Sequence, residues 1–468
     1  MYFYPVLDIN QAFVFVHNEY FIILCVFMDD FPYLCKVYEK SCTFMRVLII
    51  NTSEKTGGAA VAAHRLLDAL NKSGVKAKML VRDKASDHLT VVALRESWKQ
   101  RWNFLWERWC IFWRLRFSRK HLFEIDIANT GTDITTLPEY KEADVIHLHW
   151  INQGMLSLNN IHKILLSDKP VVWTMHDLWA ATAICHYARG CTAFTSQCHH
   201  CPLLPGGGSS HNLAAKTWKR KAGMLDGHDI HFVTCSNWLG NEARKSGLIG
   251  NQPIRSIPNP IDNHVFKPID KAKAREECGL PINKRIILFV SQRVTDKRKG
   301  MDYFIQAIKS MTLQHPEMKE DVGIAILGGH SEEFVGTLPL PIYPLGYVSD
   351  EHQIVNIYNC ADLFVLPSLE DNLPNTIMEA LSCGVPCVGF NVGGIPEMID
   401  HKQNGYIAQY QDKEDLAHGM AWVLGEANWQ SLSENAVKKV ASCYSQHNIA
   451  MKYVEVYQEA LVKKGMNL

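Results

Sequence analysis

Three features that mark common classes of protein are missing from the sequence. With 48 basic and 48 acidic side chains, the formal net charge is zero, which argues against a protein that binds nucleic acid through excess positive charge. The 14 cysteines among 468 residues are too few for a small disulfide-stapled scaffold. An apolar stretch at residues 11–28 is interrupted by His17, Asn18 and Glu19, so it falls short of the roughly 20 apolar residues of a membrane-spanning helix. What remains is a globular chain with the length of roughly two or three domains.

The first 44 residues also lack the basic start and small-residue cleavage site of a signal peptide. Met45 opens MRVLIINTSEKTGGAA, which reads as the first strand, loop and helix start of a domain. We expect Met45 to be the natural start and residues 1–44 to be an upstream or dispensable extension. A peripheral anchor is the alternative.

From Met45 onward, short β-rich runs alternate with helical stretches in two series, separated by a proline-bounded stretch at 259–268. The runs are continuously apolar, as in parallel sheets covered on both faces. This pattern predicts an α/β protein with two doubly wound, Rossmann-like domains facing a cleft, followed by C-terminal helices. The expected strands are 46–51, 77–81, 143–150, 170–176, 231–236 and 254–259, then 285–291, 323–329, 342–348, 362–368, 386–390 and 405–408.

Loops that follow the strands are where such domains bind ligands. Gly57 and Gly58 follow the first strand and open a helix, an arrangement that lets backbone N–H groups approach an anion. Asp83 would suit a dinucleotide site, but the G-x-G-x-x-G pattern is absent. In the second series, Arg293 and Lys299 lie beyond a strand end, where two cations can grip a diphosphate; an ordinary solvated loop is the alternative.

Two carboxylates follow one of the predicted strands, and two histidines lie near the end of another. Asp371 lies on a loop and Glu379, eight residues on, about one and a half turns into the next helix, where a carboxylate can accept ribose hydroxyls. His147 and His149 share one face of a strand, and we expect His149, nearer the carboxyl end, to reach the cleft and His147 to be a core histidine. Further candidates, expected to approach the ligand through their backbone or to line the acceptor side, are Gly393 and Gly394, and His176 and Asp177.

Together these motifs resemble the family-4 retaining glycosyltransferases of the GT-B fold. The motifs are GGAA, SQRVTDKRKG, PSLEDNLPNTIMEALSCGVPCV and NVGGIPEMI, and the resemblance runs from Met45 to about Gly425. It implies a cytoplasmic enzyme that moves a sugar from a nucleotide-diphosphate sugar to a glycan or lipid-linked acceptor in surface polysaccharide synthesis, such as capsule or lipopolysaccharide. No cofactor is implied for catalysis, since the nucleotide sugar is a substrate.

The resemblance also implies roles for individual residues. Arg293 and Lys299 would hold the donor diphosphate, Glu379 the ribose, and Gly58 would lie near the phosphates. His149 matches an active-site histidine that contacts the donor sugar. The family has glutamate where this chain has Asp371, and the neighbouring Glu370 could serve instead. Because such retaining transferases are thought to react on one sugar face with the leaving phosphate assisting, we do not expect Asp371 to be a nucleophile.

Two other functions stay open: a GT-B nucleotide-sugar epimerase, which an observed sugar acceptor would exclude, and a non-catalytic sugar-binding module, against which the intact cleft residues argue. The expected domains are an N-terminal acceptor-side domain (45–265) with a Cys-rich insert (185–201), a C-terminal donor domain (266–445) and a C-terminal helix (446–468).

Within the insert, four cysteines fall in seventeen residues: Cys185, Cys191, Cys198 and Cys201. Four thiols in a short irregular segment can surround a tetrahedral zinc and staple a loop without a core of its own. His186, His199 and His200 are reserve ligands. Free or redox-active thiols and two disulfides are the alternatives, the latter disfavoured in a cytoplasmic protein.

Residues 98–120 hold eight aromatic and seven basic side chains against one acidic one. On a helix this composition suits the interface of a membrane containing anionic lipid. A helix that packs its tryptophans into the core is the alternative, and stacking on nucleic-acid bases is disfavoured by the neutral net charge.

Overall fold

The computed structural model describes residues 12–17, 20–25, 45–95, 97–207, 209 and 211–466. The chain divides into a segment up to Phe44 and a body that begins at Met45. In the first segment, β1 (Ala12–His17) and β2 (Tyr20–Cys25) pair antiparallel. The expectation that Met45 is the natural start concerns residues 1–44, of which 1–11, 18–19 and 26–44 lie outside the described residues.

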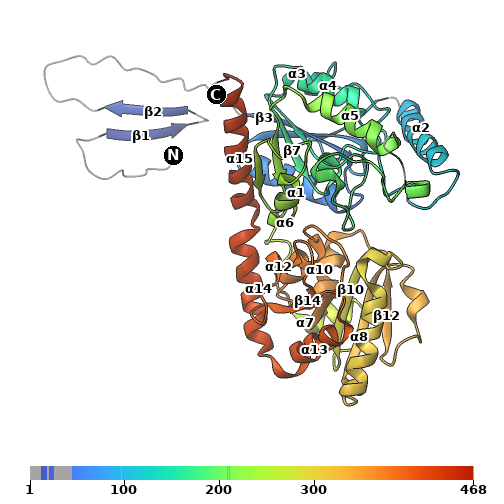
Figure 1. Ribbon diagram of the computed structural model, residues 1–468. Helices are drawn as coiled ribbons and strands as arrows, with labels where there is room; N and C mark the ends of the chain where they lie inside the picture. Colours follow the sequence, from blue (N-terminus) through green and yellow to red (C-terminus); the bar gives the residue numbers. More distant parts are fainter. Residues whose placement is uncertain are drawn as a thin grey trace. The chain divides into compact units, whose positions relative to one another are not determined.

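The N-terminal half of the body holds a seven-stranded parallel sheet in the order β5-β4-β3-β6-β7-β8-β9 (Figure 1). Its strands are β3 (Arg46–Ser53), β4 (Lys76–Asp83), β5 (Val91–Ala93), β6 (Val145–Leu148), β7 (Val171–Met175), β8 (His231–Thr234) and β9 (Ile254–Ser256). Its helices are α1 (Gly58–Lys72), α2 (Ser97–Arg114), α3 (Pro138–Glu142), α4 (Leu158–Leu165), α5 (Leu213–Leu225) and α6 (Asn237–Arg244). The short edge strand β5 was not among the expected strands.

The C-terminal half holds a six-stranded parallel sheet in the order β12-β11-β10-β13-β14-β15. Its strands are β10 (Arg285–Arg293), β11 (Val322–Gly329), β12 (Ile342–Gly346), β13 (Leu363–Leu366), β14 (Cys387–Phe390) and β15 (Gly405–Ala408). The helices are α7 (Lys271–Glu277), α8 (Met301–Gln314), α9 (Met318–Asp321), α10 (Glu351–Asn359), α11 (Asn375–Ser382), α12 (Ile395–Met398), α13 (Lys413–Ala421), α14 (Trp429–Cys443) and α15 (Gln446–Lys463).

Both sheets are buried on two faces, and this explains the continuously apolar strands. In β3, Leu48 and Ile50 belong to one apolar cluster while Val47 and Ile49 belong to another on the opposite face. In each sheet the strand order reverses beside the first strand, β3 or β10. Ligand crevices form at such reversal points, so the fold directs attention to the loops after these strands and their neighbours. The predicted pair of doubly wound domains is confirmed.

The last helix, α15, returns to the N-terminal domain and packs against α1 (Figure 1). Two of its tyrosines reach the sheet: Tyr457 OH lies 2.8 Å from Nδ1 of His147, and Tyr453 OH lies 3.0 Å from the Thr174 hydroxyl. That hydroxyl lies 2.8 Å from Nε2 of His147. Both ring nitrogens of His147 therefore have partners, as expected of a core histidine.

This histidine should make the protein sensitive to acid. Burial lowers the pKa of His147 to about 3, whereas an unfolded histidine titrates near 6.5. Between these values only the unfolded chain binds the proton, so stability should fall as the pH drops below about 6.5. We expect His147→Gln to lose about 1–3 kcal/mol at pH 7 but to lose less stability than the wild type on acidification. Urea denaturation across pH 4–7 measures both, with the exposed His264→Gln as control; equal slopes for wild type and His147→Gln would contradict the prediction.

Candidate active site

Polar contacts join the two domains along the ends of their strands. The Asn372 side chain accepts a hydrogen bond from the Ser236 hydroxyl and donates one to the His176 carbonyl oxygen at 3.2 Å. The Glu397 carboxylate accepts hydrogen bonds from the Asn237 and Trp238 amides at 2.9 and 2.8 Å, at the start of α6. The loops after β7, β8, β13 and β14 therefore meet at one cleft.

A carboxylate and two cations meet on the C-terminal side of this cleft. Asp371 Oδ2 lies 2.5 Å from Lys299 Nζ and 3.6 Å from Arg298 Nη1, and it accepts a hydrogen bond from Ser368 at 3.1 Å. Burial alone would raise the pKa of Asp371, but Lys299 and Arg298 hold it below its ordinary value. Asp371 is thus an ionised, cation-bound carboxylate.

The turn that carries these cations depends on Gly300. Gly300 has φ +76°, and a Cβ there would lie 1.8 Å from the Pro367 carbonyl oxygen. The absence of a side chain lets the turn pack against the chain that leaves β13. Arg293, by contrast, is exposed at the end of β10, and within the described chain no hydrogen bond or ion pair joins it to Lys299 or Asp371.

Glu379 is buried on α11 and connects the two domains. Its carboxylate lies 2.7 Å from Arg65 Nη2 on α1 and accepts a hydrogen bond from Tyr358 OH at 2.7 Å. The Arg65 guanidinium also lies 4.9 Å from the centre of the Phe266 ring. A ligand held by Glu379 would therefore lie beside a contact that both domains share.

The buried His149 and the half-buried His176 form a pair at the ends of β6 and β7. Nδ1 of His149 lies 3.0 Å from Nε2 of His176. Burial lowers the pKa of His149 well below its ordinary value and that of His176 to about 4, so both rings are neutral near pH 7 and one N–H donates to the other ring. The remaining nitrogen of His149, Nε2, is buried and has no partner among the described residues, so its hydrogen-bonding capacity is unused there.

Asp177 follows His176 and takes part in a second polar network. It accepts hydrogen bonds from Trp150 Nε1 at 3.0 Å and from the Trp179 amide at 2.9 Å, and it lies 2.7 Å from Nδ1 of His186. The other nitrogen of His186 lies 2.6 Å from Asp126. Burial opposes protonation of His186, but Asp177 and Asp126 together raise its pKa to about 10. A pocket beside this network is lined from both domains by Trp150, Asp177, His186, Tyr187, Arg189 and Arg298, among others.

Comparison with known proteins identifies the chain. A family model described as Glycosyltransferase Family 4 matches residues 56–265, and one described as Glycosyl transferases group 1 matches residues 284–426. Between them the two models cover most of both domains. The chain is a glycosyltransferase of family 4.

Relatives of this glycosyltransferase differ in how much of the chain they share. It is 25% identical to an uncharacterized glycosyltransferase of Methanocaldococcus jannaschii, over 73% of this chain and 91% of that protein. It is also 25% identical to the UDP-Gal:alpha-D-GlcNAc-diphosphoundecaprenol alpha-1,3-galactosyltransferase of Escherichia coli, over 54% of this chain and 69% of that one. It is 27% identical to the D-inositol 3-phosphate glycosyltransferase of Thermobispora bispora over 44% of this chain, and the match spans only about half (50%) of that relative.

Solved structures confirm the GT-B fold. Sucrose-phosphate synthase from Thermosynechococcus elongatus superimposes with a TM-score of 0.61 at 17% identity, over 90% of this chain and all (100%) of that one. Anabaena HepE in complex with UDP-glucose superimposes with a TM-score of 0.59 at 16% identity, over 89% of this chain and all (100%) of HepE.

The glycines of the glycosyltransferase motifs also serve packing. A Cβ on Gly393 or Gly394 would lie 1.8 or 1.9 Å from the carbonyl oxygens of Asp371 and Asn372, and the Gly394 amide donates a hydrogen bond to Asp371 at 3.3 Å. These two glycines therefore let the loop before α12 support the Asp371 loop. Gly58, at the start of α1, accepts a hydrogen bond from the Asn375 side chain at 3.0 Å.

The two candidate carboxylates differ in their surroundings. Glu370 is half-buried, and burial raises the pKa of its carboxyl; its backbone oxygen accepts a hydrogen bond from Arg298 at 2.8 Å. Lys299 and Arg298 form their ion pairs with Asp371 and not with the Glu370 carboxylate. Residues that sequence reasoning missed are Arg65, Asp126, Trp150, Tyr187, Arg189, Arg298, Tyr358 and Ser368. Arg298 adjoins Lys299, Trp150 adjoins His149, Ser368 lies in the motif that carries Asp371, and Tyr187 and Arg189 lie in the Cys-rich insert. Arg65, Asp126 and Tyr358 belong to none of these segments, so no local signal marked them.

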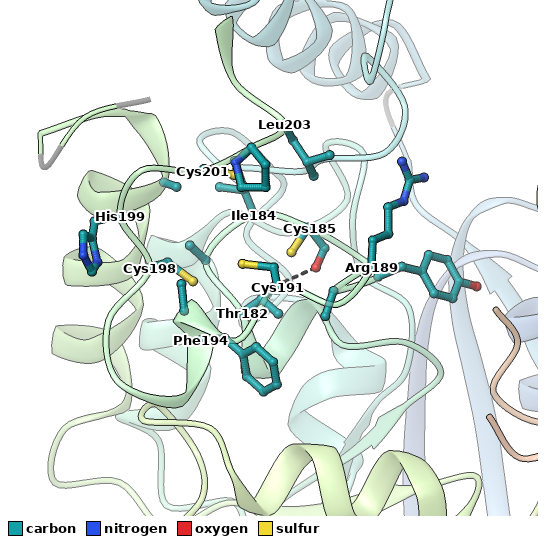
Figure 2. Close-up of a pocket in the computed structure, with 16 residues that line it drawn as sticks. Thr182, Ile184, Cys185, Arg189, Cys191, Phe194, Cys198, His199, Cys201 and Leu203 are labelled. Atoms are coloured by element: carbon teal, nitrogen blue, oxygen red, sulfur yellow. Dashed lines mark hydrogen bonds between the residues drawn. The ribbon is translucent and has the colours of Figure 1, made fainter. Parts of the chain in front are cut away.

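The four cysteines of the insert line a separate pocket in the N-terminal domain (Figure 2). All four are free thiols. His186 follows Cys185 directly, so the insert also supplies a residue to the network around Asp177.

Proposed function

We propose that this glycosyltransferase transfers a sugar, with retention of configuration, from a nucleoside diphosphate sugar to a saccharide or lipid-linked saccharide during surface polysaccharide synthesis. The observation that carries the proposal is the cluster of Lys299, Arg298 and Asp371, which the Asn372 contact links to the His176–His149 pair. HepE, solved with UDP-glucose, supports a donor of this class.

A nucleoside diphosphate is already a good leaving group, so the main demand on the protein is positive charge where negative charge develops. Lys299 and Arg298 supply it in the cleft, and the exposed Arg293 would add a third positive charge. Nε2 of His149 can bond a hydroxyl of the donor sugar. Asp371, occupied by Lys299, would orient this cation and the sugar, while the leaving phosphate assists attack from the same face.

A saccharide acceptor suits the pocket beside Asp177. Aromatic rings pack against the apolar faces of sugars, and carboxylates accept their hydroxyl hydrogens; this pocket offers Trp150, Tyr187 and Asp177. The name of the Escherichia coli relative states a diphosphoundecaprenol-linked GlcNAc acceptor, which supports a lipid-linked saccharide for this chain.

Helix α2 supports binding of the enzyme to a membrane surface. Its outward face is aromatic: Trp98, Trp102, Trp106, Trp109 and Trp113 are 73%, 61%, 45%, 54% and 59% exposed. Its buried face includes the polar residues Gln100, Asn103, Glu107 and Arg108, whose contacts include the Arg108–Asp126 ion pair. The tryptophans are thus not core residues.

Cationic side chains flank the tryptophans of α2. Arg101, Arg114, Arg116 and Arg119 are all exposed and would face anionic lipid headgroups. In the described part of the chain, no helix has the length and apolar character needed to cross a bilayer.

Replacing Trp106 and Trp113 together by glutamate should lower binding to vesicles with anionic headgroups by about tenfold or more, because two aromatic anchors are lost and two like charges are added. Liposome flotation measures the change. The matched control is Leu313→Glu with Ile282→Glu, which adds the same charge at exposed apolar positions of the other domain. Unchanged flotation of the tryptophan variant would contradict membrane docking through α2.

A donor screen tests the proposed activity. Purified protein is incubated with each nucleoside diphosphate sugar, with and without membrane extract as acceptor, and nucleoside diphosphate release is followed. We expect release with one donor that depends on the extract, together with a labelled saccharide product of retained anomeric configuration. Interconversion of the free donor without acceptor would instead indicate an epimerase.

A further inference from the structure

The Cys-rich insert (185–201) lies in the connection between β7 and α5. This connection has little regular structure. Its only regular elements within the described residues are the short 3₁₀ turns Trp179–Ala181, Ala193–Thr195 and Pro205–Gly207. Cys198 and Cys201 are buried, while Cys185 and Cys191 are half-buried. Figure 2 shows the thiols of Cys185, Cys191 and Cys198 directed into the same pocket, with Cys201 at its edge. We propose that these four thiols bind one structural zinc ion.

A second observation, independent of the spacing, comes from Lys221 on α5. Its side chain is 1% exposed, and its ammonium donates hydrogen bonds to the carbonyl oxygens of Trp179 and, at 3.0 Å, Thr182. The ammonium also lies 3.4 Å from the centre of the Trp179 ring. Within the described chain no carboxylate lies within 4.0 Å of it. A buried cation normally has an anionic partner.

The insert supplies this partner if its thiols bind zinc. Burial lowers the pKa of Lys221 to about 7, and Cys185 and Cys198, when ionised, are the two groups that most oppose this loss of charge, ahead of Asp177 and Asp126. Both of these carboxylates are already paired with His186. Four thiolates around Zn²⁺ carry a net charge of minus two. Neutral thiols would leave Lys221 without a counter-charge, and disulfides would do the same. Zinc binding therefore accounts for both the cysteines and the buried lysine.

The zinc would hold one wall of the proposed acceptor pocket. Directly after Cys185, His186 contacts Asp177 and the Tyr187 ring lies 5.0 Å from the Arg298 guanidinium of the other domain. A zinc-bound Cys185 anchors this segment at its start. This consequence depends on the proposed function, whereas zinc binding itself does not.

One other group on the chain could hold a metal ion. His64, Asp68 and His88 are, among the described residues, the set whose ligand atoms all lie within 4.8 Å of one another. No three of the four insert thiols lie within 4.8 Å of one another, whereas a tetrahedral zinc with Zn–S bonds near 2.3 Å requires sulfur atoms roughly 3.8 Å apart. Binding must draw the thiols together, and the experiment must identify the ligands as well as count the metal.

The test is zinc content and zinc ligation of the full chain, purified under reducing conditions without chelator. We expect about one zinc per chain with sulfur neighbours only, by elemental analysis and X-ray absorption. Cys191→Ser with Cys198→Ser should lose the zinc, and His64→Ala with His88→Ala should keep it. Less than about half an equivalent, or nitrogen and oxygen ligands lost with the histidines, would overturn the proposal.

Loss of zinc can unfold the insert, so two measurements avoid the cysteine variants. Cobalt substitution of the wild-type protein should give the intense sulfur-to-cobalt absorption of a tetrahedral thiolate site. Lys221→Met, which keeps the length and apolar contacts of the side chain, should lower zinc affinity by roughly 10- to 100-fold in competition with a chromogenic chelator. A cobalt spectrum without thiolate bands would refute the site, and unchanged affinity in a folded Lys221→Met protein would refute the counter-charge on which the argument rests. Neither readout depends on sugar transfer, so the site and the proposed activity can fail separately.

Discussion

Replacing Lys299 by alanine should reduce sugar transfer by roughly 100- to 1000-fold, the usual effect of removing one preorganised charge-stabilising group. Lys299 is the cation nearest to the buried Asp371, at 2.5 Å. In the proposed reaction it neutralises charge that builds up on the leaving diphosphate. Its loss would also leave Asp371 with only the more distant Arg298 at 3.6 Å. Initial rates of nucleoside diphosphate release, measured over a range of donor concentrations, give the effect on kcat and KM.

The matched control is Lys297→Ala, two residues away on the same turn and exposed to solvent. Its activity should stay within about twofold of the wild type, since exposed charges contribute little. Near-normal transfer by Lys299→Ala, or equal losses in the two variants, would show that Lys299 does not act on the diphosphate.

Replacing Glu379 by alanine should weaken donor binding by roughly 100-fold, because losing one partner of a buried, hydrogen-bonded charge pair costs about 2–5 kcal/mol. Two effects contribute. A ribose hydroxyl loses its acceptor, and Arg65, which lies 2.7 Å from the carboxylate, remains as an unpaired cation in a mostly buried position. Calorimetric titration with the nucleoside diphosphate measures donor affinity, and thermal unfolding measures the loss of stability.

Arg65→Met separates these effects. This variant breaks the contact between α1 and α11 but keeps the carboxylate, which Tyr358 still bonds at 2.7 Å. We expect it to lower stability while retaining donor affinity within about fivefold, as for a lost packing contact. If Arg65→Met weakened donor binding as much as Glu379→Ala, the role of Glu379 would be to join the domains and not to bind the donor.

The fold could be predicted because its signal is local and repeated. Each buried parallel strand needs apolar residues on both faces, so β3 or β13 appears in the sequence as an unbroken apolar run whatever surrounds it. The exception is β5, three residues at a sheet edge (Val91–Ala93), which is too short to give such a run. Helix α2 could not be assigned to core or surface, since its buried polar face and exposed tryptophans reverse the usual pattern of a surface helix.

The candidate site could be predicted only where a motif carries its residues. Asp371 and Lys299 were proposed separately, from different motifs, and the structure places them in one ion pair. Their partner Arg298 adjoins Lys299 in the run DKRKG, where the sequence does not distinguish one cation from another. Arg65 and Tyr358, which hold Glu379, lie 314 and 21 residues away from it, and nothing in their own neighbourhoods marks them.

By itself the sequence determined the fold class and the family, and it supplied candidate residues for the cleft, because apolar periodicity and glycine-bearing loops are properties of short segments. Only the tertiary structure decided which groups share a charge environment. Asp371 is ionised because two cations lie against it, His149 is neutral because it is buried beside His176, and Lys221 lacks a carboxylate because of where α5 packs. Such properties depend on distances across the fold, and residues far apart in the sequence set those distances.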